Sequence, residues 1–124
     1  AGSPYVQDVV LTGLNMKEVG ALIFPAPACR EVSGLGADAP MDEVLASTPV
    51  RQRIQAIIDQ LARESTGSAS RIARALVLAE PPSPVLGEIT DKGSINQRAV
   101  LKHRAALVDA LHDGSATGIY TPQA

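Results

Sequence analysis

Apolar and polar positions follow a strand-like pattern in three parts of the chain. The runs at residues 6–12, 18–24 and 73–79 are rich in β-branched and other apolar residues, and each is followed closely by glycine or proline. Such runs predict strands. The first two are separated only by a predicted turn at residues 14–17, which indicates a hairpin or two adjacent strands.

Helical spacing dominates most of the remaining chain. The apolar positions of residues 49–64 recur every three or four residues after Thr48-Pro49, a hydroxyl cap followed by proline, and predict a helix. A short helix is expected over residues 40–46, because Pro40 suits a first helical position. Residues 28–32 are weakly helical. A last helix is expected over residues 95–112, with Gly114 as its stop.

Together these elements predict an α+β (α/β-like) fold, with a small sheet of about three strands and helices packed against it. The pattern does not reveal the strand order. Residues 65–70 are expected to form a loop, and residues 115–124 a flexible tail, because Gly, Thr, Pro and Gln are frequent there.

Length, composition and charge limit the class of protein. The 124 residues suit one domain, and 45% hydrophobic residues are enough for a core. A net charge of −2 argues against nucleic acid as a partner. Apolar stretches of about nine residues are too short to span a membrane, for which about 20 are needed. With no secretory signal visible, the cytoplasm is the default location.

Aromatic and metal-binding residues are scarce. Aromatic residues make up 2% of the chain, whereas pockets for small molecules usually recruit them. We therefore expect this chain to form only part of such a site. The lone Cys29 excludes an internal disulfide, and neither His103 nor His112 has a partner at metal-ligand spacing, so no metal site is expected.

The segment from Thr90 to Arg98 is the most informative for chemistry. Ser94 and Gln97 have the spacing of a capping box at a helix start. Lys92 precedes this cap in a glycine-containing loop, where backbone amides and the helix dipole favour an anion such as phosphate or carboxylate. The alternative is that Lys92 is simply a solvated loop lysine. Arg98 and Arg104 on the last helix are secondary phosphate-binding candidates.

Two segments resemble the C-terminal subdomain of adenylate-forming acid–CoA ligases, particularly the feruloyl-CoA synthetase type. They read PYVQDVVLTGLNMKEVGALIFP near the start and RALVLAEPPSPVLGEITDKGSINQRAVLKHRAALVDAL near the end. The resemblance is assigned to residues 1–114. It implies a mobile lid that works with a large N-terminal domain outside this sequence, closing in one orientation for adenylation and in another for thioester formation.

The resemblance also implies a functional loop. The family motif has a Thr, two variable residues, then Gly-Lys and an apolar residue, with its Lys bridging the acid carboxylate and the α-phosphate. Here Thr90, Gly93 and Ile95 match. Ser94, however, occupies the lysine position, and the lysine is Lys92. If the loop is extended, residues two apart project similarly, so Lys92 could take over the role. The alternative is that the role is displaced to Lys102 or weakened.

The sequence therefore leads to two hypotheses. In the first, the chain is the lid of an ATP-dependent acid–CoA ligase with Lys92 as its catalytic residue and Thr90, Gly93 and Ser94 in its nucleotide-binding loop. ATP, Mg²⁺, CoA and a small aromatic or other carboxylic acid would be used by the full-length enzyme, and none would be bound by this fragment alone. In the second, the chain is a non-catalytic binding or assembly module.

Overall fold

The computed structural model describes residues 5–13, 19–36, 38–64 and 72–122. Its strands are β1 (Val6–Thr12), β2 (Val19–Pro25) and β3 (Ile72–Val77). Its helices are α1 (Ala28–Ser33), α2 (Met41–Ala46), α3 (Thr48–Glu64), α4 (Gln97–His103) and α5 (Ala105–Asp113). The predicted turn at 14–17 and loop at 65–70 lie outside the described residues.

The described strands form a three-stranded mixed sheet in the order β1-β2-β3. β1 and β2 pair antiparallel, with Val9 opposite Ile23, as the hairpin hypothesis predicts. β3 pairs parallel to β2, with Leu22 opposite Leu76. Because parallel strands require a crossover connection, the chain passes through α1, α2 and α3 before it returns to the sheet.

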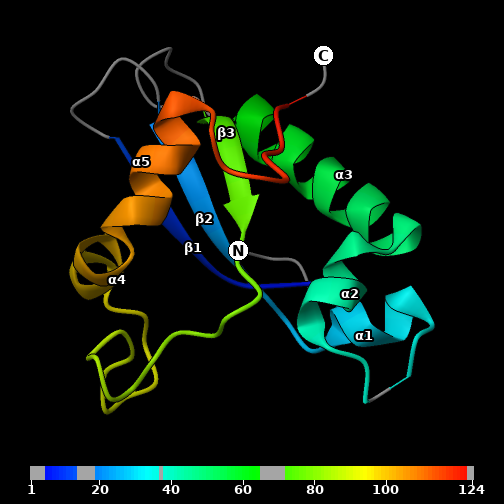
Figure 1. Ribbon diagram of the computed structural model, residues 1–124, viewed down its shortest axis with the longest axis horizontal. Helices are drawn as coiled ribbons and strands as arrows, with labels where there is room; N and C mark the ends of the chain where they lie inside the picture. Colours follow the sequence, from blue (N-terminus) through cyan, green and yellow to red (C-terminus); the bar gives the residue numbers. More distant parts are fainter. Residues whose placement is uncertain (1–4, 14–18, 37, 65–71, 123–124) are drawn as a thin grey trace.

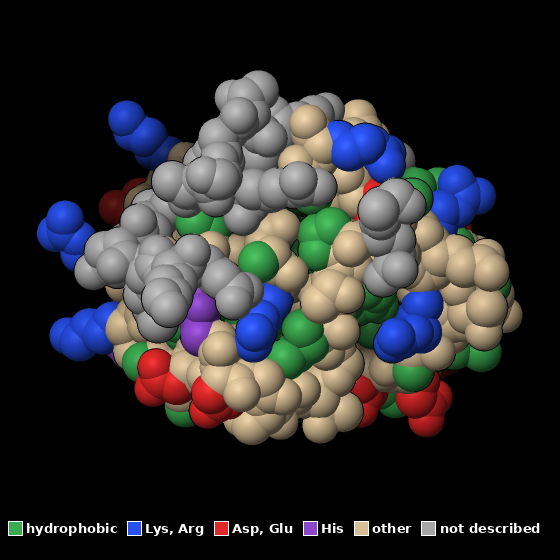
Figure 2. All heavy atoms as spheres, turned by 90° about the horizontal axis from the view of Figure 1, so that it is seen from above, with side chains coloured by type: hydrophobic (Ala, Val, Ile, Leu, Met, Phe, Trp, Pro, Cys, Tyr) green, Lys and Arg blue, Asp and Glu red, His purple; other side chains and the backbone are tan. Residues whose placement is uncertain are grey.

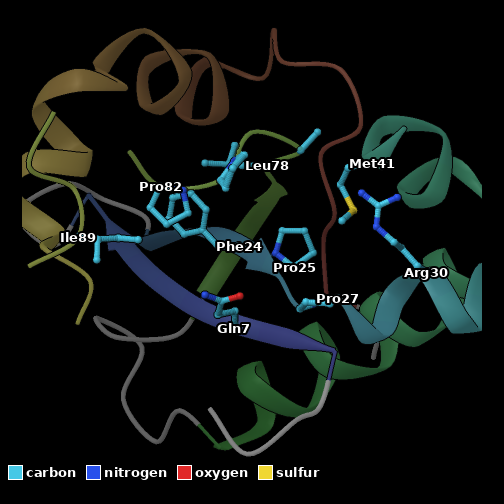
Figure 3. A pocket seen from close by; sticks show the side chains of 11 residues that line it. Gln7, Phe24, Pro25, Pro27, Arg30, Met41, Leu78, Pro82 and Ile89 are labelled. Atoms are coloured by element: carbon cyan, nitrogen blue, oxygen red, sulfur yellow. The ribbon is translucent and has the colours of Figure 1, made fainter. Parts of the chain in front are cut away.

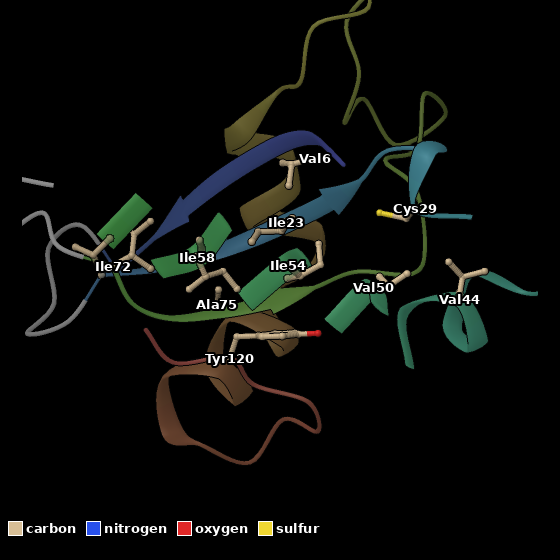
Figure 4. Packing of buried hydrophobic residues seen from close by; sticks show 12 residues of the cluster. Val6, Ile23, Cys29, Val44, Val50, Ile54, Ile58, Ile72, Ala75 and Tyr120 are labelled. Carbon is tan, nitrogen blue, oxygen red and sulfur yellow. The ribbon is translucent and has the colours of Figure 1, made fainter. Parts of the chain in front are cut away.

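The central strand β2 is buried on both faces of the sheet because helices cover each of them (Figure 1). Its residues alternate between the two faces, as the period of a strand requires. Ala21 and Ile23 pack in a cluster with residues of α3, including Ile54 and Ile58 (Figure 4). Leu22 and Phe24 pack in a second cluster with Val100 of α4 and Leu111 of α5.

The predicted helix over residues 95–112 is wrong in its start and in its continuity. Ile95 pairs with Ile89 in an isolated antiparallel bridge, so it is extended and not helical. The helix cap is Asn96, whose side chain accepts a hydrogen bond from Ala99 N at 3.3 Å, and not Ser94 as the capping box predicted. The helix is then interrupted at Arg104, which has φ −111° and ψ 27° and separates α4 from α5.

The segment after α5 packs on the sheet, where a flexible tail was expected. Gly114 ends α5 with φ +83°, as predicted. Tyr120 then exchanges backbone hydrogen bonds with Ala75 of β3 at 2.9 and 2.8 Å, and its side chain is buried in the first cluster. Arg51 of α3 lies over the Tyr120 ring, 5.1 Å from its centre. Residues up to Tyr120 therefore belong to the folded domain.

Candidate functional site

The segment singled out in the sequence forms a tight hairpin. Thr90 N donates to Ser94 O at 2.8 Å, and Gly93 N donates to Thr90 O at 2.9 Å. Gly93 has φ +79°, the left-handed conformation that completes a three-residue hairpin turn and that glycine adopts without strain. Ser94 N also donates to Thr90 Oγ1 at 3.2 Å. The hairpin thus uses Thr90, Gly93 and Ser94 for its own hydrogen bonds.

Lys92 occupies the tip of this hairpin, between Asp91 and Gly93, and its side chain is exposed. The hairpin corrects one step of the sequence argument. Lys92 and Ser94 do not project alike, because the chain reverses direction at Gly93 and is not extended there. What the fold offers instead is an ammonium group at the end of a short, closed turn.

A buried ion pair supports the base of the hairpin. Arg104 Nε donates to Glu88 Oε2 and Arg104 Nη2 to Glu88 Oε1, each at 3.0 Å. Glu88 is fully buried and Arg104 is 9% exposed. Glu88 also accepts a hydrogen bond through its backbone O from Asn96 N at 2.7 Å. The ion pair therefore holds both ends of the hairpin segment against the break between α4 and α5.

Arg104 also fixes the proline-rich segment that precedes Glu88. Its Nη1 donates to Glu80 O at 3.1 Å and its Nη2 to Pro81 O at 2.9 Å. The guanidinium lies over the Phe24 ring, 5.0 Å from its centre. These interactions engage Nε, Nη1 and Nη2 of the guanidinium. Arg104 is therefore a structural residue and not the phosphate-binding candidate that its place on a helix suggested.

The ion pair changes the acidity of Glu88. Hydrogen bonds from Arg104 lower the pKa of the Glu88 carboxyl, and the hydrogen bond from Ser83 N at 2.8 Å acts in the same direction. Burial raises the pKa, and its effect is smaller than that of the Arg104 hydrogen bonds but larger than that of the Ser83 hydrogen bond. Glu88 is therefore ionised at neutral pH, which the bidentate geometry requires.

Sequence reasoning missed this pair, although one signal was present. Val100, Val108 and Leu111 form an apolar stripe at helical spacing, and Arg104 stands within that stripe. A cation on a core-facing stripe needs a buried partner. The pattern could thus have indicated a buried ion pair, but not that its partner is Glu88, which lies sixteen residues earlier in the chain.

The remaining residues considered in the sequence take no part in the hydrogen bonds of the Lys92 hairpin. Arg98 and Lys102 are exposed on α4, as is His103. His112 Nε2 lies 2.8 Å from Thr12 Oγ1. Cys29 is buried and donates from Sγ to Tyr5 O at 3.2 Å; burial raises the pKa of its thiol. A buried, protonated thiol is a poor nucleophile.

A pocket of about 310 Å³ lies between the proline-rich segment and the α1–α2 region (Figure 3). Its lining is mainly apolar, with Phe24, Pro82 and Ile89 toward one end and Met41 and Arg30 toward the other. This volume is at the lower limit for a ligand pocket. None of Thr90, Lys92, Gly93 or Ser94 lines it, so the pocket and the candidate loop are different features.

The described residues contain neither a cluster of metal-ligating side chains nor a membrane-spanning helix. Within residues 5–13, 19–36, 38–64 and 72–122, no three His, Cys, Asp or Glu side chains gather so as to hold a metal ion. No helix in those ranges is both long and apolar enough to cross a membrane.

On the face shown in Figure 2, Lys and Arg side chains lie dispersed and do not form a single patch.

Comparison with known families gives a match over residues 1–116, to the family described as AMP-binding enzyme C-terminal domain. The chain belongs to this family. No curated protein and no solved structure gave a match. The mixed three-stranded sheet with packed helices is consistent with this C-terminal domain. Membership indicates that the chain is part of an adenylate-forming enzyme and implies an N-terminal partner domain.

Proposed function

We propose that this AMP-binding C-terminal domain serves an ATP-dependent acid–CoA ligase of the feruloyl-CoA synthetase type. The reaction is the attack of an acid carboxylate on the α-phosphate of ATP, which releases pyrophosphate and forms an acyl-adenylate. The CoA thiol then attacks the acyl carbon, forming the thioester and releasing AMP. The acid, aromatic or otherwise, is selected by the N-terminal domain, and the isolated chain is expected to be inactive.

The observation that supports this proposal most is the exposed Lys92 at the tip of a hairpin with a rigid base. An ammonium group placed at the reacting phosphate stabilises the negative charge that develops in the transition state. The Glu88–Arg104 pair ties the hairpin base to the junction of α4 and α5. A hairpin held in this way loses little conformational freedom when the lid closes. Thr90, Gly93 and Ser94 shape the turn that presents Lys92.

The proposed full-length enzyme uses Mg²⁺ and CoA together with ATP. Mg²⁺ binds nucleotides largely through phosphate oxygens and a few carboxylates. The carboxylate nearest to Lys92 in sequence is that of the exposed Asp91, and one carboxylate does not make a magnesium cage. We therefore assign the Mg²⁺ that accompanies ATP to the phosphates and the N-terminal domain.

The test is acid-dependent pyrophosphate release by the full-length enzyme with ATP and a panel of hydroxycinnamic, benzoic and fatty acids. Lys92→Ala is expected to lower adenylation by at least about a hundredfold, the size of effect seen for a removed oxyanion donor. Thioester formation from a supplied acyl-adenylate should be largely retained. Equal loss of both half-reactions would contradict the role of Lys92.

Two further variants separate the alternatives. Lys102→Ala, which removes an exposed lysine of α4, is the matched control and should be nearly neutral; loss here instead of at Lys92 would place the role on Lys102. The double variant Lys92→Ala/Ser94→Lys moves the lysine to the family's position. Recovery of adenylation would show that either hairpin position can present the ammonium group. Absence of release with every acid would favour the binding or assembly module.

A further inference from the structure

Large apolar side chains are exposed on a second turn next to the hairpin. Val85 is 93% exposed and Leu86 is 49% exposed. They are adjacent in the chain and lie at the tip of the loop between Pro84 and Gly87. Because they are adjacent, the two side chains form a small continuous apolar surface, and burying it against a partner would be favourable.

This turn is built to keep its shape. Gly87 N donates to Pro84 O at 3.1 Å, and Glu88 N donates to Ser83 O at 2.9 Å, which closes the loop at its base. Leu86 N donates to Ser83 Oγ at 3.2 Å. The prolines in the segment restrict φ. A preordered tip loses little conformational entropy when it docks, so the exposure of Val85 is a fixed feature of the fold.

Glu88 is hydrogen-bonded both to the turn that carries Val85 and to the Lys92 hairpin. The Glu88 carboxylate accepts from Ser83 N on the side of the turn, and its backbone O accepts from Asn96 N on the side of the hairpin. Both features lie in the segment below α4 (Figure 1). Val85 and Lys92 are seven residues apart, so their Cα atoms lie within about 25 Å, less than the breadth of an ordinary domain.

We propose that Val85 and Leu86 insert into an apolar recess of the N-terminal AMP-binding domain of the same enzyme, beside its nucleotide site, when Lys92 is in place. This inference rests on the proposed function, because it uses the encounter between Lys92 and that domain. A surface that receives the hairpin tip therefore lies within about 25 Å of the neighbouring turn. The recess is expected to be apolar and uncharged, since Val85 and Leu86 have no polar side-chain atoms.

The first test is adenylation by the full-length enzyme carrying Val85→Asp or Leu86→Asp. A charge buried in an apolar contact is costly, so Val85→Asp is expected to lower adenylation by about tenfold or more, as at an interface hot spot. The matched control is Leu35→Asp, at a residue that is 50% exposed and follows α1 in the chain. In Figure 1, α1 lies on the opposite side of the molecule from α4. Leu35→Asp should leave adenylation unchanged. Unchanged adenylation in Val85→Asp would overturn the proposal.

The second test does not depend on activity. Val85→Cys in the full-length enzyme is treated with a maleimide, with and without a non-hydrolysable acyl-adenylate mimic, and modification at position 85 is measured by mass spectrometry. The mimic should slow labelling about tenfold, whereas Leu35→Cys should react equally in both conditions. Equal rates at position 85 would overturn the proposal. Protection that depends on enzyme concentration would also overturn it, by indicating a second copy as the partner.

The two proposals fail in different ways. If Lys92→Ala abolishes adenylation while Val85→Asp and Val85→Cys behave like their controls, the docking proposal is wrong and the proposed function stands. If the wild-type enzyme adenylates no acid but position 85 is protected relative to position 35, the proposed function is wrong and the contact with the N-terminal domain stands.

Discussion

Glu88 and Arg104 form a bidentate, buried ion pair between residues sixteen positions apart, with both N···O distances at 3.0 Å. Through Glu88 the pair connects the proline-rich turn to the Lys92 hairpin, and through Arg104 it connects both to the junction of α4 and α5. A surface loop is thereby joined to the second apolar cluster, whose Phe24 ring lies under the guanidinium.

Removing one member of this pair should be strongly destabilising. Arg104→Met leaves the buried Glu88 carboxylate without its main partner, and we expect a loss of about 3–5 kcal/mol in the free energy of unfolding. Urea denaturation measures it. Arg98→Met, at an exposed position of the adjacent α4, is the control and should change stability by less than about 0.5 kcal/mol. A loss in Arg104→Met no larger than in the control would contradict the structural role of the pair.

The ion pair also predicts how stability depends on pH. The pKa of Glu88 is lowered from its ordinary value of 4.5 in the folded state, so below that value the unfolded state binds more protons than the folded state. The stabilisation is therefore complete above pH 4.5 and is lost as the pH falls through the lower, folded pKa. Urea denaturation from pH 7 to pH 3 should show a steeper loss in the wild type than in Glu88→Gln. Parallel profiles would show that Glu88 is not responsible.

The packing around Gly20 of β2 leaves too little space for a methyl group, so Gly20→Ala is expected to destabilise the fold. A Cβ at this position would lie 2.6 Å from Thr12 Oγ1 and 2.9 Å from Leu111 Cδ2. Both residues are buried, so Gly20→Ala forces them apart and should cost about 1–3 kcal/mol. A thermal melt of Gly20→Ala tests this, and Gly20→Ala/Thr12→Ala, which removes the obstructing hydroxyl, should recover part of the loss. If Gly20→Ala melts at the wild-type temperature, the prediction is wrong and α5 packs less tightly on β2 than these distances indicate.

Cys29 should be unreactive until the domain unfolds. Burial raises the pKa of its thiol, which lowers the thiolate fraction at neutral pH, and the side chain packs in the first apolar cluster. Alkylation by iodoacetamide at pH 7.5 is expected to be more than about tenfold slower in the native protein than in urea. The rate in native buffer should rise in Arg104→Met if that variant opens the fold. Equal rates in buffer and urea would show that Cys29 is accessible.

Local patterns in the sequence determined much of the secondary structure. The strand predicted at residues 6–12 has the observed bounds of β1. The helix predicted at 49–64 differs from α3 by one residue at its start. These elements are predictable because their apolar spacing and their flanking proline or glycine act within a few residues. The family resemblance to a C-terminal domain of AMP-binding enzymes is also carried by the sequence alone and agrees with the family match.

Tertiary structure decided what local patterns could not. The helix predicted through Arg104 is broken there, because the guanidinium is bound to Glu88 and to two backbone carbonyls of a distant segment. The parallel pairing of β3 and the docking of Tyr120 on Ala75 likewise depend on partners far away in the chain. Periodicity reports which face of an element is apolar. Which distant group satisfies a buried charge or an open strand edge is determined only when the chain has folded.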